Sequence, residues 1–234
     1  MGTNINRFKT GTGIPPLDPG TYPATCCIVA DLGRQVTVFD GKEKETNQIL
    51  LTWELPDEQL NYDGEMRPRW ISQTFTASVN EKAKLRLWLK NWRGRDFTPQ
   101  ELEDFDLKNV LGAPCVITVT QTEKNGAVYS NIGGISKIMK GMEVKPPTKK
   151  VHFSIECEDT WPMFAELPEW VRNKINGSLT LKEMGMVFGD DGTASKTDAP
   201  MTAGSGSAMH GQTGAPPMDD MGNDDAINDD DLPF

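Results

Sequence analysis

The chain has 234 residues, a formal net charge of −10 and a charged fraction of 25%. No apolar run approaches the length of about 18 residues that a transmembrane helix requires, and the N-terminus lacks the apolar segment of a secretory signal. The sequence therefore predicts a cytoplasmic protein without a membrane anchor. The cysteines show no C-x-x-C spacing and are expected to be buried and reduced: Cys26, Cys27, Cys115 and Cys157.

Composition divides the chain into three parts. Residues 1–19 are rich in Gly and Pro and predict an extended arm with no core of its own. Residues 20–188 show the apolar periodicity of a folded domain with a helical extension at its C-terminal end. Residues 189–234 consist mainly of Gly, Ser, Thr, Met, Pro and Asp, too few apolar residues to offset the entropy of ordering, so a disordered tail is predicted. Ten aspartates against one lysine give this tail a charge of −9, nearly all of the chain's excess.

The first two strands are predicted from alternation. Residues 20–39 read as a long strand that bends at Gly33, because a glycine inside a strand pattern marks a bend or bulge. Residues 48–55 predict a second strand, whose apolar face is expected in the core and comprises Ile49, Leu51, Trp53 and Leu55. A bent first strand is what a small barrel requires, since two sides of the barrel share it.

A loop is predicted over residues 56–69, followed by a third strand over residues 70–79. Trp70 lies on the polar face of this strand, directly after Arg67 and Arg69. A tryptophan of the barrel core is expected on the other face, so Trp70 is predicted to have a different role.

A helical insert follows the third strand. Asn80 is placed to cap a helix over residues 81–93, which Gly94 is placed to end. Its apolar stripe is expected to pack on the core and comprises Leu85, Trp88, Leu89 and Trp92. A second stripe fits a nucleic-acid path and an ordinary solvated face equally well: Lys82, Arg86, Lys90 and Arg93. The pattern from Thr98 predicts a capped short helix over residues 99–105.

The second half of the domain begins with a predicted hairpin. Residues 115–123 and 127–138 form its strands around an Asn-Gly turn. Three strands, a helical insert and two more strands is the order of an oligonucleotide-binding (OB) fold, so the predicted class is mainly β with a five-stranded barrel. Residues 151–156 are expected to add a sixth strand or to pair with a neighbouring subunit, and residues 168–175 to form a helix.

No catalytic constellation is recognisable in the sequence. It has two histidines, no P-loop, no G-x-S-x-G motif and no Cys/His cluster with metal-ligand spacing. The expectation is a protein that is not an enzyme and that needs neither a cofactor nor a metal.

The last six residues combine acidic and apolar character: Asp229, Asp230, Asp231, Leu232, Pro233 and Phe234. Capture of a C-terminal carboxylate is a known mode of peptide recognition, although an acidic run can also serve solubility alone. This ending resembles the tip of bacterial single-stranded DNA-binding proteins, in which an acidic run and Ile-Pro-Phe follow a Gly/Pro-rich linker behind an OB barrel. Leu232 stands in place of Ile. The elaborated domain is more similar to the phage-encoded type.

The resemblance implies sequence-independent binding and protection of single-stranded DNA in replication or recombination, with residues 229–234 recruiting partner enzymes. The setting would be a bacterial cell or a phage-infected host, and the protein a monomer or a small homo-oligomer. One alternative is a protein-interaction adaptor or DNA-mimic regulator with an OB-like domain. Another is an accessory subunit of a nuclease or annealing complex.

Binding of a single strand needs aromatic faces for the bases and positive charge for the backbone. Trp70 is the strongest stacking candidate, with Arg67 and Arg69 as phosphate partners. Tyr129 and Phe39 share the polar faces of their strands, although each could instead pack under a loop at the barrel end. The remaining basic candidates lie near loops or strand ends and are Lys137, Lys140, Lys149 and Lys150.

Overall fold

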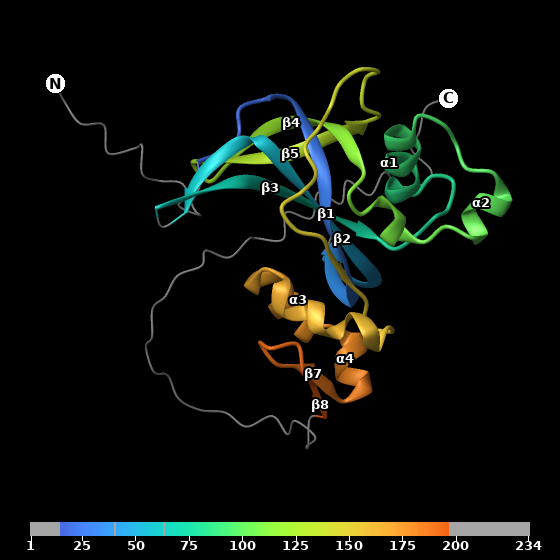
Figure 1. Ribbon diagram of the computed structural model, residues 1–234. Coiled ribbons are helices and arrows are strands. Elements are labelled where there is room, and N and C mark those ends of the chain that lie inside the picture. Colours follow the sequence, from blue (N-terminus) through green and yellow to red (C-terminus); the bar gives the residue numbers. More distant parts are fainter. Residues whose placement is uncertain (1–14, 40, 63, 197–234) are drawn as a thin grey trace.

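Five long antiparallel strands form a curled sheet (Figure 1) in the computed structural model, which describes residues 15–39, 41–62 and 64–196. They are β1 (Gly20–Phe39), β2 (Lys42–Tyr62), β3 (Glu65–Thr76), β4 (Pro114–Lys124) and β5 (Ala127–Ser136). Their order in the sheet is β3-β2-β1-β4-β5. The prediction of a mainly β protein is confirmed, and β3 and β5 are the edges of the curled sheet.

Short helices and strands complete the fold. Between β3 and β4 lie α1 (Lys84–Arg93), α2 (Pro99–Glu103) and the 3-10 helix η2 (Leu107–Val110). After β5 come β6 (Val151–Phe153), the 3-10 helix η3 (Glu158–Glu166), α3 (Glu169–Asn176), α4 (Leu179–Met184), β7 (Met186–Phe188) and β8 (Ala194–Lys196). Within the described ranges, none of these helices has the length and apolar content needed to span a bilayer.

The predicted bend in β1 is present at Gly33. Its φ is +70°, and the pairing of β1 with β2 shifts register between Asp31 and Gly33. A Cβ added at Gly33 would lie 2.9 Å from Ile155 Cδ1, so this position requires both the conformational freedom and the small volume of glycine.

The predicted loop over residues 56–69 is wrong. β2 continues to Tyr62, and β3 begins at Glu65 rather than at Trp70. The pairing of the two strands shifts register between Leu55 and Gln59, next to Pro56. A proline removes a ladder hydrogen bond and is tolerated at a bulge, so Pro56 interrupts the ladder without ending the strand.

The helical insert confirms the predicted apolar stripe but not the predicted cap. α1 begins at Lys84 with Ala83 as its N-cap, so Asn80 does not cap it. Gly94 ends α1 in the left-handed conformation, with φ +77°, as predicted. The capping box of α2 is also present, because Thr98 and Glu101 each accept a hydrogen bond from the other's backbone N–H.

The sheet is buried on both faces. The inner core lies between the curled sheet and α1 and is built around Trp53, Ile71, Phe75, Trp88, Trp92 and Ile117. The outer core lies between the opposite face and the elements after β5 and is built around Ile28, Leu32, Leu50, Phe153, Phe164 and Val171. Cys26 belongs to the inner core and its neighbour Cys27 to the outer core, as alternation predicts.

The segment after β5 forms part of the same sheet. β6 pairs in parallel with Ile28–Ala30 of β1, so the sixth strand is added within the chain. Cys157 is exposed rather than buried, because it lies beyond β6 at the start of η3. The hairpin of β7 and β8 continues the fold to Lys196, beyond the expected boundary at residue 188.

Residues 15–17 lie between the two edges of the curled sheet. The Leu17 N–H donates to Ser130 Oγ of β5 at 2.6 Å, and Gln121 Nε2 of β4 donates to the Leu17 carbonyl at 2.7 Å. On β3, the Arg69 guanidinium donates to the Pro15 carbonyl. The Leu17 side chain is 3% exposed and packs in the inner core. The expectation of an arm without a core is therefore wrong for this segment, while residues 1–14 lie outside the described residues.

Replacing Leu17 by Ala should lower the free energy of unfolding by about 2–5 kcal/mol, the usual cost of truncating a buried leucine. Val38→Ala is the control, because Val38 is 68% exposed. Urea unfolding monitored by circular dichroism measures both. Equal stability of the two variants would contradict the packing of Leu17 in the inner core.

Candidate nucleic-acid interface

Trp70 lies on the outer face of β3, at the margin of the outer core. Its ring is half-buried and packs against that core, whereas the next residue, Ile71, is buried in the inner core. The indole Nε1–H donates to Glu54 Oε2 at 3.1 Å, across the pairing of β2 with β3. Trp70 therefore does lie apart from the inner core, but it is not a fully exposed platform.

Glu54 is a buried carboxylate that the sequence analysis missed. Glu54 is only 1% exposed to solvent. Besides Trp70, its oxygens accept hydrogen bonds from the Thr148 backbone N–H at 2.9 Å and from Thr148 Oγ1 at 2.5 Å. A buried charge is tolerated when its oxygens are hydrogen-bonded in this way. Glu54 thus joins three parts of the chain: β2, β3 and the segment that precedes β6.

That segment, residues 137–150, is named here the basic strap. It begins beside α1, where the Lys137 N–H donates to the Asn91 carbonyl at 3.2 Å. Further along, Thr25 Oγ1 of β1 donates to the Lys145 carbonyl at 2.9 Å. Figure 1 shows it crossing in front of the sheet from β5 to β6. Its basic residues are Lys137, Lys140, Lys145, Lys149 and Lys150.

Lys149 of the basic strap lies over the indole ring of Trp70. Its Nζ is 5.2 Å from the ring centroid, within the range of a cation–π contact. The same Nζ donates to the backbone carbonyl of Glu166 at 2.8 Å and to Glu166 Oε2 at 3.2 Å. An aromatic ring and a lysine are thus brought together where the basic strap meets the end of η3.

The basic stripe of α1 is largely compensated by acidic neighbours. Lys90 and Arg86 pair with Asp96, at 2.9 and 3.6 Å. Arg93 and Arg95 pair with Glu101, at 2.5 and 2.6 Å. The hydrogen bonds from Arg95 and Arg93, together with one from the Thr98 N–H, hold the pKa of Glu101 far below its usual range. These pairs leave the α1 stripe less able to attract phosphates than its four cations suggest.

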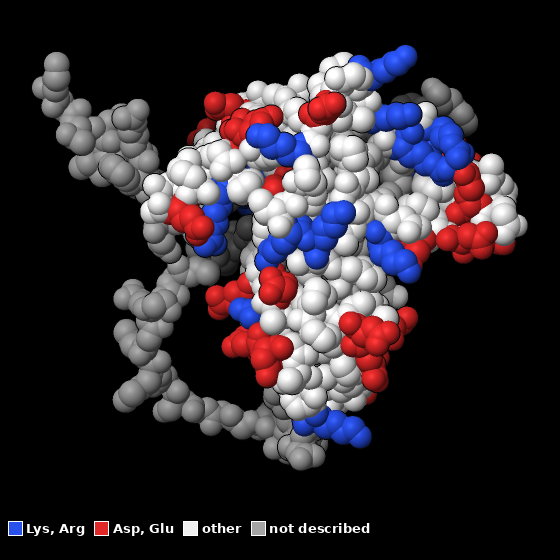
Figure 2. Space-filling model, in the orientation of Figure 1, with Lys and Arg blue, Asp and Glu red and all other residues white. Residues whose placement is uncertain are grey.

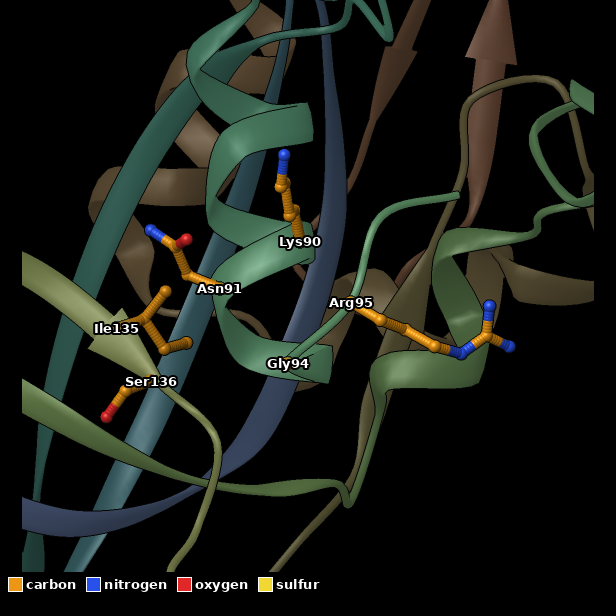
Figure 3. Close-up of a pocket in the computed structure, with 6 residues that line it drawn as sticks. All are labelled: Lys90, Asn91, Gly94, Arg95, Ile135 and Ser136. Carbon is orange, nitrogen blue, oxygen red and sulfur yellow. The ribbon is translucent and has the colours of Figure 1, made fainter. Parts of the chain in front are cut away.

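An open hollow lies beside the C-terminal end of α1 (Figure 3), with a volume of about 450 Å³. It is lined by Lys90, Asn91, Gly94, Arg95, Ile135 and Ser136. In Figure 3 the side chain of Arg95 extends away from Ile135 and Ser136.

The other predicted contacts are more dispersed. Arg67 is exposed and donates to Glu65 at 2.9 Å. Arg69 is held by Pro15, and partial burial lowers its pKa. Tyr129 is half-buried on β5, the opposite edge of the sheet order from Trp70. The two arginines are thus held by Glu65 and Pro15, whereas Trp70 is held by Glu54.

Four predicted contacts remain. Three of them are exposed lysines of the basic strap, and within the described residues none of the three forms an ion pair: Lys137, Lys140 and Lys150. Phe39 ends β1 opposite Lys42, but its side chain lies outside what the structure describes. The partner-binding residues 229–234 also lie outside the described residues.

Three of the four cysteines are buried in the two cores. Burial raises the pKa of the Cys26, Cys27 and Cys115 thiols, which disfavours the nucleophilic thiolate. In the described part of the chain, no three His, Cys, Asp or Glu residues are grouped as a metal site would require. Comparison of the chain with family models, with curated proteins and with solved structures gave no match.

Replacing Glu54 by Ala should lower the free energy of unfolding by about 1.5–3 kcal/mol, because the hydrogen bonds of this buried carboxylate to Trp70 and Thr148 are lost. Asp57→Ala is the matched control on β2, since the Asp57 side chain is 68% exposed. Urea unfolding measures stability, and amide hydrogen exchange at Thr148 reports the basic strap. Unchanged exchange at Thr148 would contradict the role given to Glu54.

Proposed function

We propose that the protein binds single-stranded DNA without sequence preference and protects it during replication or recombination. The observation that supports this most is the meeting of Trp70 with Lys149 on the outer face of β3. Proteins that bind single strands combine aromatic rings, on which bases stack, with positive charge along the backbone path. Here the ring comes from the sheet and the charge from the basic strap.

We infer further that the curled sheet is an OB-fold. The strand order β3-β2-β1-β4-β5, with helices between β3 and β4, agrees with that barrel. OB-folds bind oligonucleotides on the face of their second and third strands. Trp70 lies on that face of β3 and Glu54 on that of β2, which favours this part of the surface as the binding path.

The distribution of charge favours the same path. Residues 151–188 hold six acidic and three basic side chains, whereas residues 137–150 hold five basic and one acidic. In Figure 2, basic side chains gather in the middle of the view, where Figure 1 shows the basic strap, and acidic ones gather lower down, over the C-terminal elements. A strand that follows the basic strap would therefore avoid most of the acidic surface, and its binding should weaken as salt rises.

The C-terminal tip, residues 229–234, forms the second part of the proposal. Its acidic run and terminal Phe234 would bind a replication or recombination enzyme. Attachment through residues 197–228 would raise the local concentration of that enzyme at the DNA without any new contact.

Replacing Trp70 by Ala should weaken binding of a poly-dT oligonucleotide about 5- to 150-fold, the loss expected for one stacked base. Trp70→Phe should retain most of the affinity. Both variants lose the hydrogen bond to Glu54, so their difference isolates the aromatic face. Anisotropy of a labelled oligonucleotide measures affinity, and quenching of tryptophan fluorescence at low and high salt reports stacking.

The same titration separates this proposal from an adaptor that binds another protein. Wild-type protein that neither quenches nor shifts the oligonucleotide at low salt would refute DNA binding. Binding that is the same in Trp70→Ala and wild type would refute the assigned site.

Truncation after Lys196 should tighten DNA binding, and more so at low salt. The deletion removes eight aspartates that would compete with DNA phosphates for basic groups, while all described residues remain. A tail of full length with these aspartates replaced by Asn is the control for length and should behave like the truncation. Unchanged or weaker binding by both proteins would exclude competition by the tail.

A further inference from the structure

We propose that Lys149 blocks the stacking face of Trp70 in the free protein and moves away when a single strand binds. The inference rests on the proposed function and gives Lys149 a role beyond the phosphate contact that the sequence predicts. Lys149 Nζ lies 5.2 Å from the ring centroid and is held there by the backbone carbonyl and the carboxylate of Glu166. A base cannot stack on the ring face that this ammonium covers.

The ring stays in place while the lysine moves. Trp70 is held at its edge by the 1% exposed Glu54 and packs against the outer core. The side chains of Lys149 and Glu166 are 35% and 56% exposed, and ion pairs of this kind contribute little to stability. A lysine has a long flexible stem. Moving Lys149 away from the ring therefore costs little free energy.

Opening is favourable when one ligand replaces the contacts of Lys149 with the Trp70 ring and with the Glu166 carboxylate. A stacked base takes the place of the ammonium on the ring, and the adjacent phosphate takes the place of the Glu166 carboxylate. An unpaired strand offers base and phosphate together. The bases of a duplex are already stacked on one another, so a duplex offers only the phosphate. Lys149 thus favours single strands over duplexes at this position.

The test compares Glu166→Gln with Asp57→Asn in the full-length protein. Each variant removes one carboxylate from an ion pair with a lysine of the basic strap, because Lys145 Nζ lies 3.8 Å from Asp57 Oδ1. Their long-range effects on DNA should therefore be similar, but only Glu166→Gln weakens the hold on the lysine over Trp70, which keeps its hydrogen bond to the backbone carbonyl of residue 166. We expect Glu166→Gln to bind poly-dT about two- to fivefold more tightly than Asp57→Asn, in keeping with the modest strength of such pairs.

The Trp70→Ala background supplies the decisive control. The advantage of Glu166→Gln over Asp57→Asn should disappear there, because no ring remains to be uncovered. Equal affinities of the two variants in the presence of Trp70, or an advantage that persists without it, would overturn the proposal. If the wild type fails to bind poly-dT, the proposed function itself is refuted. If the wild type binds, the comparison of the variants tests the role of Lys149 separately.

Discussion

Burial on both faces of β1 is the constraint on which the rest of the structure depends. Most strands of a small antiparallel barrel have one face in the core and one in water, but here an outer core covers the second face. Ile28 and Ala30 lie in that core and pair with β6, while Cys26 and Val29 lie in the inner core. Fully burying an aliphatic side chain contributes about 1.5–3 kcal/mol, so both cores contribute substantially to stability.

The outer core also restricts where a ligand can bind. It occupies the outer face of β1 and reaches Leu50 on β2, and Trp70 of β3 lies at its margin. Polar groups at this margin must be satisfied as water is excluded, and the hydrogen bonds of Glu54 do this. The same hydrogen bonds hold Thr148, and through it the neighbouring Lys149, beside Trp70. The hydrogen bonds that allow the outer core to cover the sheet therefore also place Lys149 at the edge of the covered region.

The sequence predicted the elements that depend on local patterning. Alternation identified β1 with its bend at Gly33, the inner face of β2, and Trp70 as a residue outside the inner core. Prediction was weaker where a tertiary contact overrides a local signal. Pro56 looks like the end of a strand but occupies a bulge, and Asn80 looks like a cap although α1 begins at Lys84.

The candidate site was predictable only in part, for a related reason. Trp70 could be identified because it is a large aromatic residue on the polar face of its strand. Lys149, Glu166 and Thr148 are distant from it in sequence, and no pattern within a segment indicates that they meet. One signal was available: Glu54 stands in an otherwise apolar strand, and a buried acid requires donors. That signal predicts partners for Glu54 without saying which residues provide them.

Net charge is a poor guide to the ligand of this chain, because its charges are separated along the sequence. Residues 189–234 account for −9 of the total of −10, so the preceding residues are close to neutral. Within these, α1 pairs its cations with Asp96 and Glu101, whereas the basic strap holds five lysines against one acidic residue. A phosphate backbone responds to the local potential rather than to the sum. A nearly neutral domain with an acidic tail can therefore present a basic path, provided that Glu54 keeps the basic strap against the sheet.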